Sequence, residues 1–245
     1  MSDAVRKRFG EPAELIAELE DLRAAETQER LRRLLTMTGE ERALDVGTGA
    51  GAFAIALAPF VREVVGVDIV PELLEEGRKR APANVELVGA DSTALPYERG
   101  SFDLVCTART LHHVQRPELV LAEMNRVLRP GGTMLVIDQL APVDSLAAIE
   151  LNSFERARDP STTRILAEVD LRGFFVRTEN LVLVNPTLYV LGFRIFDVQL
   201  EPPEGVARQR RVLLLSRDAI TKPTDVSVLP LGDECYLAAK EKAAA

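Results

Sequence analysis

Short apolar runs alternate with helical repeats of apolar positions over the first 140 residues of the chain. The runs have the length and composition of buried strands, at residues 42–46, 63–68, 84–89, 102–107 and 133–138. Helical patterns lie between them at residues 52–58, 71–80 and 117–128. This rhythm predicts an α/β fold with a parallel sheet and helices on both faces. Right-handed crossovers then place the C-terminal ends of the strands at one rim, where ligands bind.

The two ends of the chain are patterned differently. Leucines at helical spacing over residues 12–36 predict one or two N-terminal helices, with Leu15, Leu19 and Leu22 in the core. After residue 138 the pattern weakens. It indicates a helix over residues 163–171 and strands over 179–184, 192–200 and 234–239, with no firm helical pattern over 202–231.

Three glycines at alternate positions, Gly47, Gly49 and Gly51, separate the first strand from the first helix of the sheet. Glycine permits positive φ and leaves no side chain between the backbone and a ligand. A tight turn without a ligand is the alternative. The order of strand, glycine turn and helix favours a ligand-binding loop at the opening of a doubly wound fold.

Polar residues follow the next strands at the same predicted rim. Asp68 ends the second strand, where a carboxylate can accept hydrogen bonds from both ribose hydroxyls of a nucleoside. Asp91 and Ser92 follow the third strand and can meet the edge of an adenine. Together they predict an adenosine pocket. The alternatives are an N-cap role for Asp68 and a turn-capping role for Asp91 and Ser92.

Dinucleotide binding shares part of this pattern, because Gly47, Gly49 and Ala52 satisfy the loose form G-x-G-x-x-A. An NAD(P)-dependent oxidoreductase is therefore an alternative function. Asp45 argues against it, since a carboxylate just before the glycines disfavours a pyrophosphate and suits a ligand amine. Asp45 can also cap the amides of the loop, and the two roles stay open.

The composition narrows the choice of partners. The chain of 245 residues carries a net charge of −8, which argues against nucleic acid as the main partner. No apolar run has membrane-spanning length and residues 1–6 do not resemble a signal peptide, so we expect a cytoplasmic protein. Cys106 is expected in the core, and His112 and His113 lack zinc-type spacing, so no metal site is expected.

Five motifs in order resemble those of class I S-adenosylmethionine-dependent methyltransferases. They are Leu-Asp-Val-Gly-Thr-Gly-Ala-Gly at 44–51, Val-Asp at 67–68, Gly-Ala-Asp at 89–91, Ser-Phe-Asp-Leu-Val at 101–105 and Leu-Arg-Pro-Gly-Gly-Thr at 128–133. The run Leu-His-His-Val at 111–114 is similar to the ubiquinone/menaquinone-biosynthesis-type (methyltransferase domain 11-like) branch. The resemblance covers residues 40–140.

The resemblance implies a Rossmann-like sheet of seven strands, mostly parallel, whose last strand is antiparallel and falls at residues 234–239. It implies one domain, with N-terminal lid helices in 1–40, a cofactor-binding core in 41–140 and substrate-side strands in 141–245. The implied cofactor is S-adenosyl-L-methionine, with S-adenosyl-L-homocysteine as product. Its implied binding residues are Gly47, Thr48, Gly49 and Gly51 along the methionine part, Asp45 near the amino group, Asp68 at the ribose, Ile69, Asp91 and Ser92 at the adenine, and Ala108 and Arg109 near the sulfonium.

The activity implied is methyl transfer to a small organic acceptor by in-line displacement. Quinone C-methylation is a narrower alternative, and a non-catalytic protein of the same fold is another. His112 and His113 are the candidate imidazole bases, against a structural role at a helix start. Arg109 either binds an acidic substrate or pairs with a surface acid.

Overall fold

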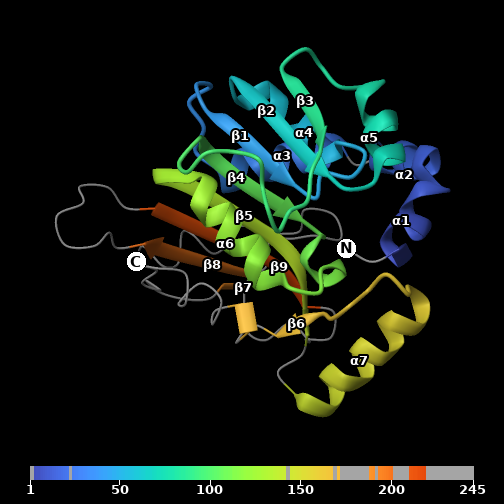
Figure 1. The fold of residues 1–245 in the computed structure, drawn as a ribbon. Coiled ribbons are helices and arrows are strands. Elements are labelled where there is room, and N and C mark those ends of the chain that lie inside the picture. The colour runs from blue at the N-terminus through green and yellow to red at the C-terminus, as the bar shows by residue number, and fades with distance from the viewer. Residues whose placement is uncertain are drawn as a thin grey trace.

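The computed structural model describes residues 3–21, 24–141, 144–167, 170–171, 188–190, 193–200 and 210–218. One sheet forms the centre of the molecule (Figure 1). Its strands are β1 (Arg42–Val46), β2 (Glu63–Asp68), β3 (Val85–Gly89), β4 (Phe102–Ala108), β5 (Leu128–Ala141), β6 (Leu166–Ala167), β7 (Leu188–Val190), β8 (Phe193–Leu200) and β9 (Arg210–Asp218). Their order is β3-β2-β1-β4-β5-β9-β8-β7, and β6 pairs with β5.

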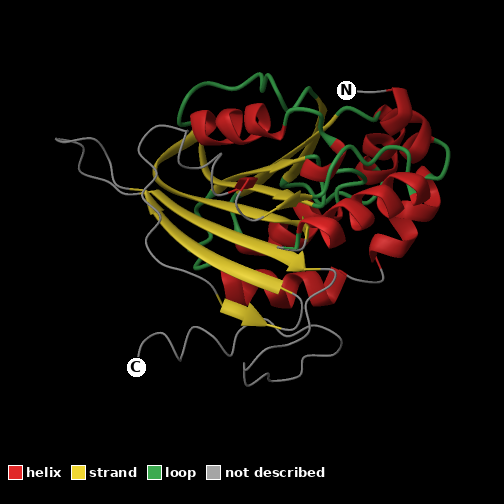
Figure 2. Ribbon diagram, turned by 90° about the horizontal axis from the view of Figure 1, so that it is seen from below, coloured by secondary structure: helices red, strands yellow, loops and turns green. Residues whose placement is uncertain are grey.

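The helices lie on both faces of this sheet (Figure 2). They are α1 (Asp3–Gly10), α2 (Ala13–Asp21), α3 (Ala24–Leu34), α4 (Ala52–Leu57), α5 (Pro71–Arg78), α6 (Pro117–Val127) and α7 (Ser145–Arg158), with short 3₁₀ turns η1 (Ala58–Phe60) and η2 (Leu111–His113). None of the described helices is long and apolar enough to cross a membrane.

Two hydrophobic cores sandwich the sheet, because alternate residues of each buried strand point to opposite faces. On one face, Val120 and Met124 of α6 pack with Leu44 of β1. On the other face, Leu31 of α3 and Leu57 of α4 pack in the cluster that holds Cys106, which is fully buried as expected. The predicted parallel α/β sheet with helices on both faces is thus confirmed for the first five strands.

The prediction of seven strands with an antiparallel last strand is wrong at the far edge of the sheet. Six strands from β3 to β9 run parallel, and β9 pairs in parallel with β5 along Thr133–Leu140. The predicted strand at 192–200 is present as β8, which runs antiparallel to β9 and β7. We predicted no element for β9, although its apolar run from Val212 to Leu215 suits a strand between two neighbours. The predicted strands at 179–184 and 234–239 lie outside the described residues.

The predicted helix over 163–171 is wrong for residues 163–167, while residues 170–171 are helical and 168–169 lie outside the described residues. Leu166–Ala167 form β6 beside Leu140 and Ala141 of β5. Just before it, the Ile165 amide donates to Asn152 Oδ1 of α7 at 2.7 Å and not to a carbonyl one helical turn earlier. We did not predict α7. It buries Leu151 but leaves Leu146, Ile149 and Phe154 exposed, so its apolar positions do not form one inward stripe.

Over residues 12–36 the structure has two helices, α2 and α3, as predicted, and α1 is a further helix that precedes them. Leu15 and Leu19 are 56% and 53% exposed, which contradicts the predicted core stripe; Leu22 lies outside the described residues. Helix α2 instead buries Ala13 and Ala17, whose small side chains allow it to pack closely on Ala50, Val70 and Leu73. Helices α1 and α2 therefore pack beside α5, against the loop that follows β1 (Figure 1).

Candidate functional site

The glycine loop after β1 needs glycine at its strained positions. Gly47, Gly49 and Gly51 have φ of 75°, 58° and 80°, a region that other residues rarely adopt. A Cβ on Gly47 would lie 2.3 Å from Thr110 Cγ2. The amides of Gly47 and Thr48 both donate to the Val67 carbonyl, at 2.8 and 3.0 Å, and fix the loop against β2.

Asp68, the last residue of β2, holds the next part of the loop. Its Oδ2 accepts from the Gly49 amide at 2.8 Å, and its Oδ1 accepts from the amides of Ile69 and Val70 at 2.7 and 2.9 Å. Burial raises the pKa of Asp68 in spite of these three bonds. Asp68 thus bonds to the Gly49 amide and to two amides before α5. Both lone pairs of Oδ1 are used, and Oδ2 keeps one lone pair for a ligand.

Asp45 is 1% exposed and lies under the same loop. Its Oδ2 accepts from Thr48 Oγ1 at 2.6 Å, while Oδ1 has no partner among the described residues. Burial raises the pKa of Asp45 to about 7, and the negative charges of Asp68 and Glu20 add to the shift, while the Thr48 hydroxyl and the Ala54 backbone act to lower it. A buried carboxylate oxygen without a donor is costly, so this position suits a donor or cation from a ligand.

Glu20 on α2 belongs to the same neighbourhood, and sequence reasoning missed it. Its Oε1 accepts from Arg109 Nη2 at 3.2 Å, and its Oε2 is buried with no partner in the described part of the chain. Burial raises the pKa of Glu20. No sequence signal separated Glu20 from the exposed Glu14 and Glu18 of the same helix.

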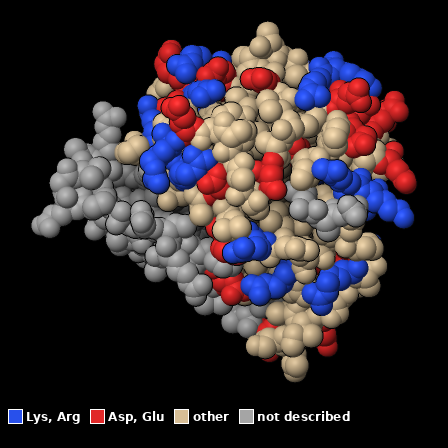
Figure 3. Space-filling view, viewed as in Figure 1, with Lys and Arg blue, Asp and Glu red and all other residues tan. Residues whose placement is uncertain are grey.

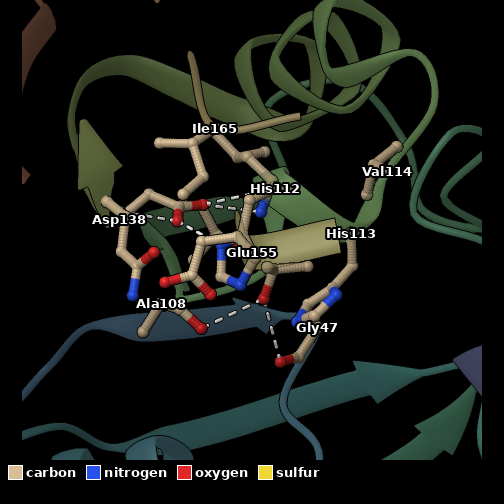
Figure 4. Close-up of polar contacts among 12 residues, drawn as sticks. Gly47, Ala108, His112, His113, Val114, Asp138, Glu155 and Ile165 are labelled. Atoms are coloured by element: carbon tan, nitrogen blue, oxygen red, sulfur yellow. Dashed lines mark hydrogen bonds and ion pairs between the residues drawn. The ribbon is translucent and has the colours of Figure 1, made fainter. Parts of the chain in front are cut away.

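The end of β4 adjoins the glycine loop. Thr110 Oγ1 lies 3.3 Å from the Gly47 carbonyl and 3.1 Å from that of Ala108, the dashed contacts to these residues in Figure 4. Arg109 between them has a φ of 56°, the one positive φ outside glycine among the described residues. Such strain is often found at functional sites. The Arg109 guanidinium pairs with Glu20, so the acid-pairing role is observed.

Asp91 and Ser92 share this rim but stand apart from Asp68. Gly89 pairs in register with Asp68, which brings the end of β3 to the same edge. Asp91 is exposed, and its Oδ1 accepts from the amide and hydroxyl of Thr93, which lowers its pKa. The turn-capping role of Asp91 is thus observed. Ser92 is 4% exposed, and its Oγ has no partner within the described ranges.

His112 lies beside a buried acid at the end of the apolar run of β5. Its Nδ1 is 2.5 Å from Asp138 Oδ1, and Asp138 Oδ2 accepts from the Leu111 amide at 2.7 Å (Figure 4). Burial acts to lower the pKa of His112, but the Asp138 carboxylate outweighs it and the pKa is raised. Asp138 therefore fixes the ring and leaves Nε2 as the second nitrogen.

His113 has a structural environment instead. Its Nδ1 lies 3.0 Å from Ser161 Oγ, and that hydroxyl donates to Asp159 Oδ1 at 2.5 Å. The ring packs edge-on against Phe9 of α1, with centroids 5.1 Å apart. Burial, helped by the neighbouring His112, lowers the pKa of His113 to about 4, so this imidazole is neutral at pH 7.

The residues of this rim fit the predicted cofactor in one specific respect. Three buried oxygens, Glu20 Oε2, Asp45 Oδ1 and Ser92 Oγ, have no hydrogen-bond partner among the residues that the structure describes. When ionised, the two carboxylate oxygens accept only, and an ammonium group supplies the donor and the positive charge that they lack. Of the three loop glycines, Gly49 has the most open surroundings, with only Leu73 within 4 Å of where a Cβ would lie, whereas Thr110 and Leu87 approach Gly47 and Gly51.

Known proteins are similar to this chain over its first half. Residues 44–136 match the family described as methyltransferase domain. The uncharacterized methyltransferase YcgJ of Bacillus subtilis is 34% identical over 129 residues, 51% of each chain. A demethylmenaquinone methyltransferase of Clavibacter sepedonicus is 34% identical over 137 residues, 55% of this chain and 56% of its own. The chain spans about half the length of the curated relatives that it matches.

Solved structures extend the similarity. The crystal structure of B. subtilis YcgJ has a TM-score of 0.63 at 26% identity, over 71% of this chain and 74% of that one. A putative methyltransferase of Bacillus halodurans has a TM-score of 0.61 at 27% identity, over 71% and 73% of the two chains. Residues 171–237 match a second family, described as anti-phage protein KwaA, and most of that segment lies outside the described residues.

Proposed function

We propose that the chain transfers a methyl group from S-adenosyl-L-methionine to a small organic acceptor, on the premise that residues 44–136, which match a methyltransferase domain, act as one. The observation that carries the proposal is the glycine loop between two buried carboxylates. Asp68 holds three amides at one side, and Asp45 leaves one oxygen without a partner at the other. A ribose and an ammonium group suit these two positions.

The proposed roles follow from where each residue lies. Gly47, Thr48, Gly49 and Gly51 present backbone to the methionine part, with Asp45 at its amino group. Asp68 accepts from the ribose hydroxyls. Ile69, which packs with the cluster under α1 and α2, covers the adenine. Asp91 and Ser92 lie at the adenine edge, and Ala108 and Arg109 lie near the sulfonium.

Bound S-adenosyl-L-methionine supplies a methyl group that is already activated on a sulfonium. The protein then has to align donor and acceptor and exclude water. Helices α1 and α2 pack against the loop and serve as the lid. Of the two histidines, His112 suits the role of base, because Asp138 fixes its Nδ1 and Nε2 has no hydrogen-bond partner among the described residues. His113 supports the wall through Ser161.

Quinone C-methylation is the narrower version of the proposal. The demethylmenaquinone methyltransferases among the relatives support it; that of Staphylococcus aureus strain JH9 is 40% identical over 106 residues, 41% of this chain and 44% of its own. A ring carbon of a quinol becomes nucleophilic when a hydroxyl loses its proton. His112 is the proposed acceptor of that proton. A demethylquinol that the protein leaves unmodified would exclude this version and leave the broader one standing.

Three further proposals concern the class of the methyl acceptor, the division of the chain and the cellular compartment. On the face in Figure 3, acidic and basic side chains are interspersed and the described residues form no continuous basic patch, which favours a small acceptor over nucleic acid. We treat residues 1–245 as one domain, with the lid in 1–40, the cofactor-binding core in 41–140 and substrate-side strands in 141–245. The free, buried Cys106 suits a reducing cytoplasm.

Titration calorimetry with S-adenosyl-L-homocysteine tests the proposal. We expect micromolar-type binding by the wild type and a severe loss in Asp68→Ala. A thermal-shift comparison with NADH in the same buffer separates the oxidoreductase alternative. Stabilisation by NADH alone, or no binding of S-adenosyl-L-homocysteine, would falsify the methyltransferase assignment.

A further inference from the structure

Glu20 is an acid from outside the methyltransferase motifs that reaches the cofactor site. It lies on α2, 24 residues before the matched region begins at residue 44. Its side chain is 20% exposed, and its Oε2 atom is buried without a partner among the described residues. Its Oε1 contacts Arg109, the strained residue directly after β4. Glu20 thus spans the gap between the N-terminal helices and the C-terminal rim of the sheet.

Arg80 holds this part of α2 against the glycine loop. Arg80 Nη2 donates to the Ala50 carbonyl at 2.7 Å, and Nη1 donates to the Ala17 carbonyl at 3.2 Å. The same guanidinium forms an ion pair with Asp21, the neighbour of Glu20. Since Ala17 lies one turn before Glu20, the position of Glu20 over the loop is set by hydrogen bonds and not only by packing.

Carboxyl groups outnumber the cations around the loop, where Arg109 and Arg80 are the two cations that act on Glu20. Glu20, Asp45 and Asp68 bring three carboxyl groups to one end of the sheet, and Asp45 is fully enclosed. Arg109 contacts one oxygen of Glu20. Glu20 Oε2 and Asp45 Oδ1 are left without donors among the described residues. Two buried acceptors of like charge are costly unless a cation or a multiple donor joins them.

We propose that Glu20 is a further cofactor-binding residue, which together with Asp45 holds the primary ammonium group of the amino-acid half of the cofactor. This inference rests on the proposed function. An ammonium group carries three donors and a full charge, so it satisfies both unpartnered oxygens at once. Helix α2 is then one wall of the site as well as its cover. The match to residues 44–136 does not include this wall.

A different role would be for Glu20 only to neutralise Arg109 or to pack α2. That role leaves Oε2 unexplained, since the contact to Arg109 uses Oε1. The two roles differ in a measurable way. An ammonium contact affects only ligands that have the amino-acid half, whereas a packing role affects every ligand that fills the adenosine half.

The test compares S-adenosyl-L-homocysteine with 5′-methylthioadenosine, which has the same adenosine and sulfur but lacks the amino-acid half. Calorimetry on the full chain is run for the wild type, Glu20→Gln and Glu18→Gln. Glu18 is exposed on the same helix and is the matched control. We expect Glu20→Gln to weaken S-adenosyl-L-homocysteine roughly tenfold to a hundredfold, the range for a lost charged hydrogen bond. We expect 5′-methylthioadenosine to bind Glu20→Gln as it binds the wild type.

Two results would overturn the inference while the proposed function stands. One is wild-type affinity of Glu20→Gln for S-adenosyl-L-homocysteine, and the other is an equal loss for both ligands. Wild-type protein that binds neither ligand would remove the proposed function, and the inference with it. A thermal melt of each variant establishes folding beforehand, and Glu20→Asp serves in place of Glu20→Gln if that variant is unfolded.

The pH dependence supplies a second readout. Binding of a cation beside Asp45 favours its charged form, so complex formation releases protons around neutral pH, where Asp45 titrates. We expect the affinity of the wild type for S-adenosyl-L-homocysteine to fall as the pH drops from 8 to 6. The pKa values of Asp68 and Glu20 are raised as well, so these groups titrate in the same direction. Arg109, Arg80 and Asp21 are the other charged groups that act on Glu20. The affinity for 5′-methylthioadenosine should change less. Equal pH profiles for the two ligands would contradict the ammonium contact.

Discussion

The carboxylate of Asp68 accepts a hydrogen bond from the Gly49 amide, 19 residues earlier in the chain, at 2.8 Å. The same side chain holds the amides of Ile69 and Val70. The acid proposed to bind the ribose therefore also shapes the loop that faces the ligand. Substitutions at this position have to be interpreted with both roles in view.

Asp68→Ala should lose stability and cofactor affinity together. Three amides lose their acceptor, so we expect the free energy of unfolding to fall by about 1–3 kcal/mol. We also expect the affinity for S-adenosyl-L-homocysteine to fall at least tenfold. Urea unfolding and calorimetry measure the two effects. Glu75→Gln, an exposed position on α5, is the control. A stable Asp68→Ala variant with unchanged affinity would contradict both roles.

Gly47→Ala should be far more damaging than Gly39→Ala. Both glycines have positive φ, 75° and 89°, but a Cβ on Gly47 would lie 2.3 Å from Thr110 and a Cβ on Gly39 meets nothing within 4 Å. The αL conformation alone costs roughly 1–2 kcal/mol. We expect Gly39→Ala near that value and Gly47→Ala a further ~2 kcal/mol lower, measured by urea unfolding. Equal losses would mean that the Thr110 contact relaxes freely.

Asp45 makes the ligand-free protein less stable as the pH rises. Its folded pKa of about 7 lies above the ordinary 3.8, so between these values the folded state binds more protons than the unfolded state. The slope of the unfolding free energy with pH is then negative, and the loss is complete above pH 7. Three pKa units correspond to roughly 4 kcal/mol.

The comparison that isolates Asp45 is with Asp45→Asn, which has no titratable group. Unfolding curves from pH 4 to pH 8 should show the variant gaining stability relative to the wild type as the pH rises. Other groups titrate in both proteins, and their contributions cancel in this difference. A difference that stays flat with pH would place the pKa of Asp45 at its ordinary value.

The two histidines of the chain should titrate far apart in NMR spectra. His112 should titrate above its ordinary 6.5 and His113 near 4. Asp138→Asn removes the nearest negative charge from the His112 ring, so burial is then opposed only by the weaker effects of Asp159 and Glu155, and the higher pKa should fall. His113 gains little from the change. A wild-type spectrum in which both rings titrate near 6.5 would contradict the buried Asp138–His112 pair.

The sign for stability follows from the same shifts. The raised pKa of His112 adds stability below pH 6.5, which is lost as the pH rises through the folded pKa. His113 acts the other way, because the unfolded chain takes up a proton below 6.5 that the folded chain refuses down to about 4. His113→Gln should therefore reduce the loss of stability on acidification to pH 5, measured by urea unfolding.

Apolar runs and turn residues in the sequence predicted the part of the fold around the glycine loop. β1 and β2 have the predicted bounds. A short apolar run that ends at turn residues has the length and composition of a strand buried on both faces. Leu15 and Leu19 were placed wrongly, because the alanines of α2 fit closer to the loop than leucines do. Periodicity identifies the apolar faces of a helix. It does not decide which face is buried when one face carries small apolar residues and the next carries large ones.

The site shows the same limit. Asp45 and Asp68 stand next to strand ends, where the topology alone brings them to one rim. Glu20 stands on a helix with other glutamates, and only the tertiary packing of α2 selects it. For Asp91 and Arg109, the sequence predicted the position but left the hydrogen-bond partner open. Each was placed at the rim by the strand before it, but the partners Thr93 and Glu20 come from local geometry and from a distant helix.

The guanidinium of Arg80 joins α2 to the carbonyl of Ala50 inside the loop. A shortened protein that began at the first strand would retain the whole sheet and the three loop glycines, and yet it would lose the wall that we propose for its cofactor site. In an activity assay, such a truncated protein would be inactive even though its sheet is intact. The first twenty-odd residues should therefore be kept in any protein prepared for assay.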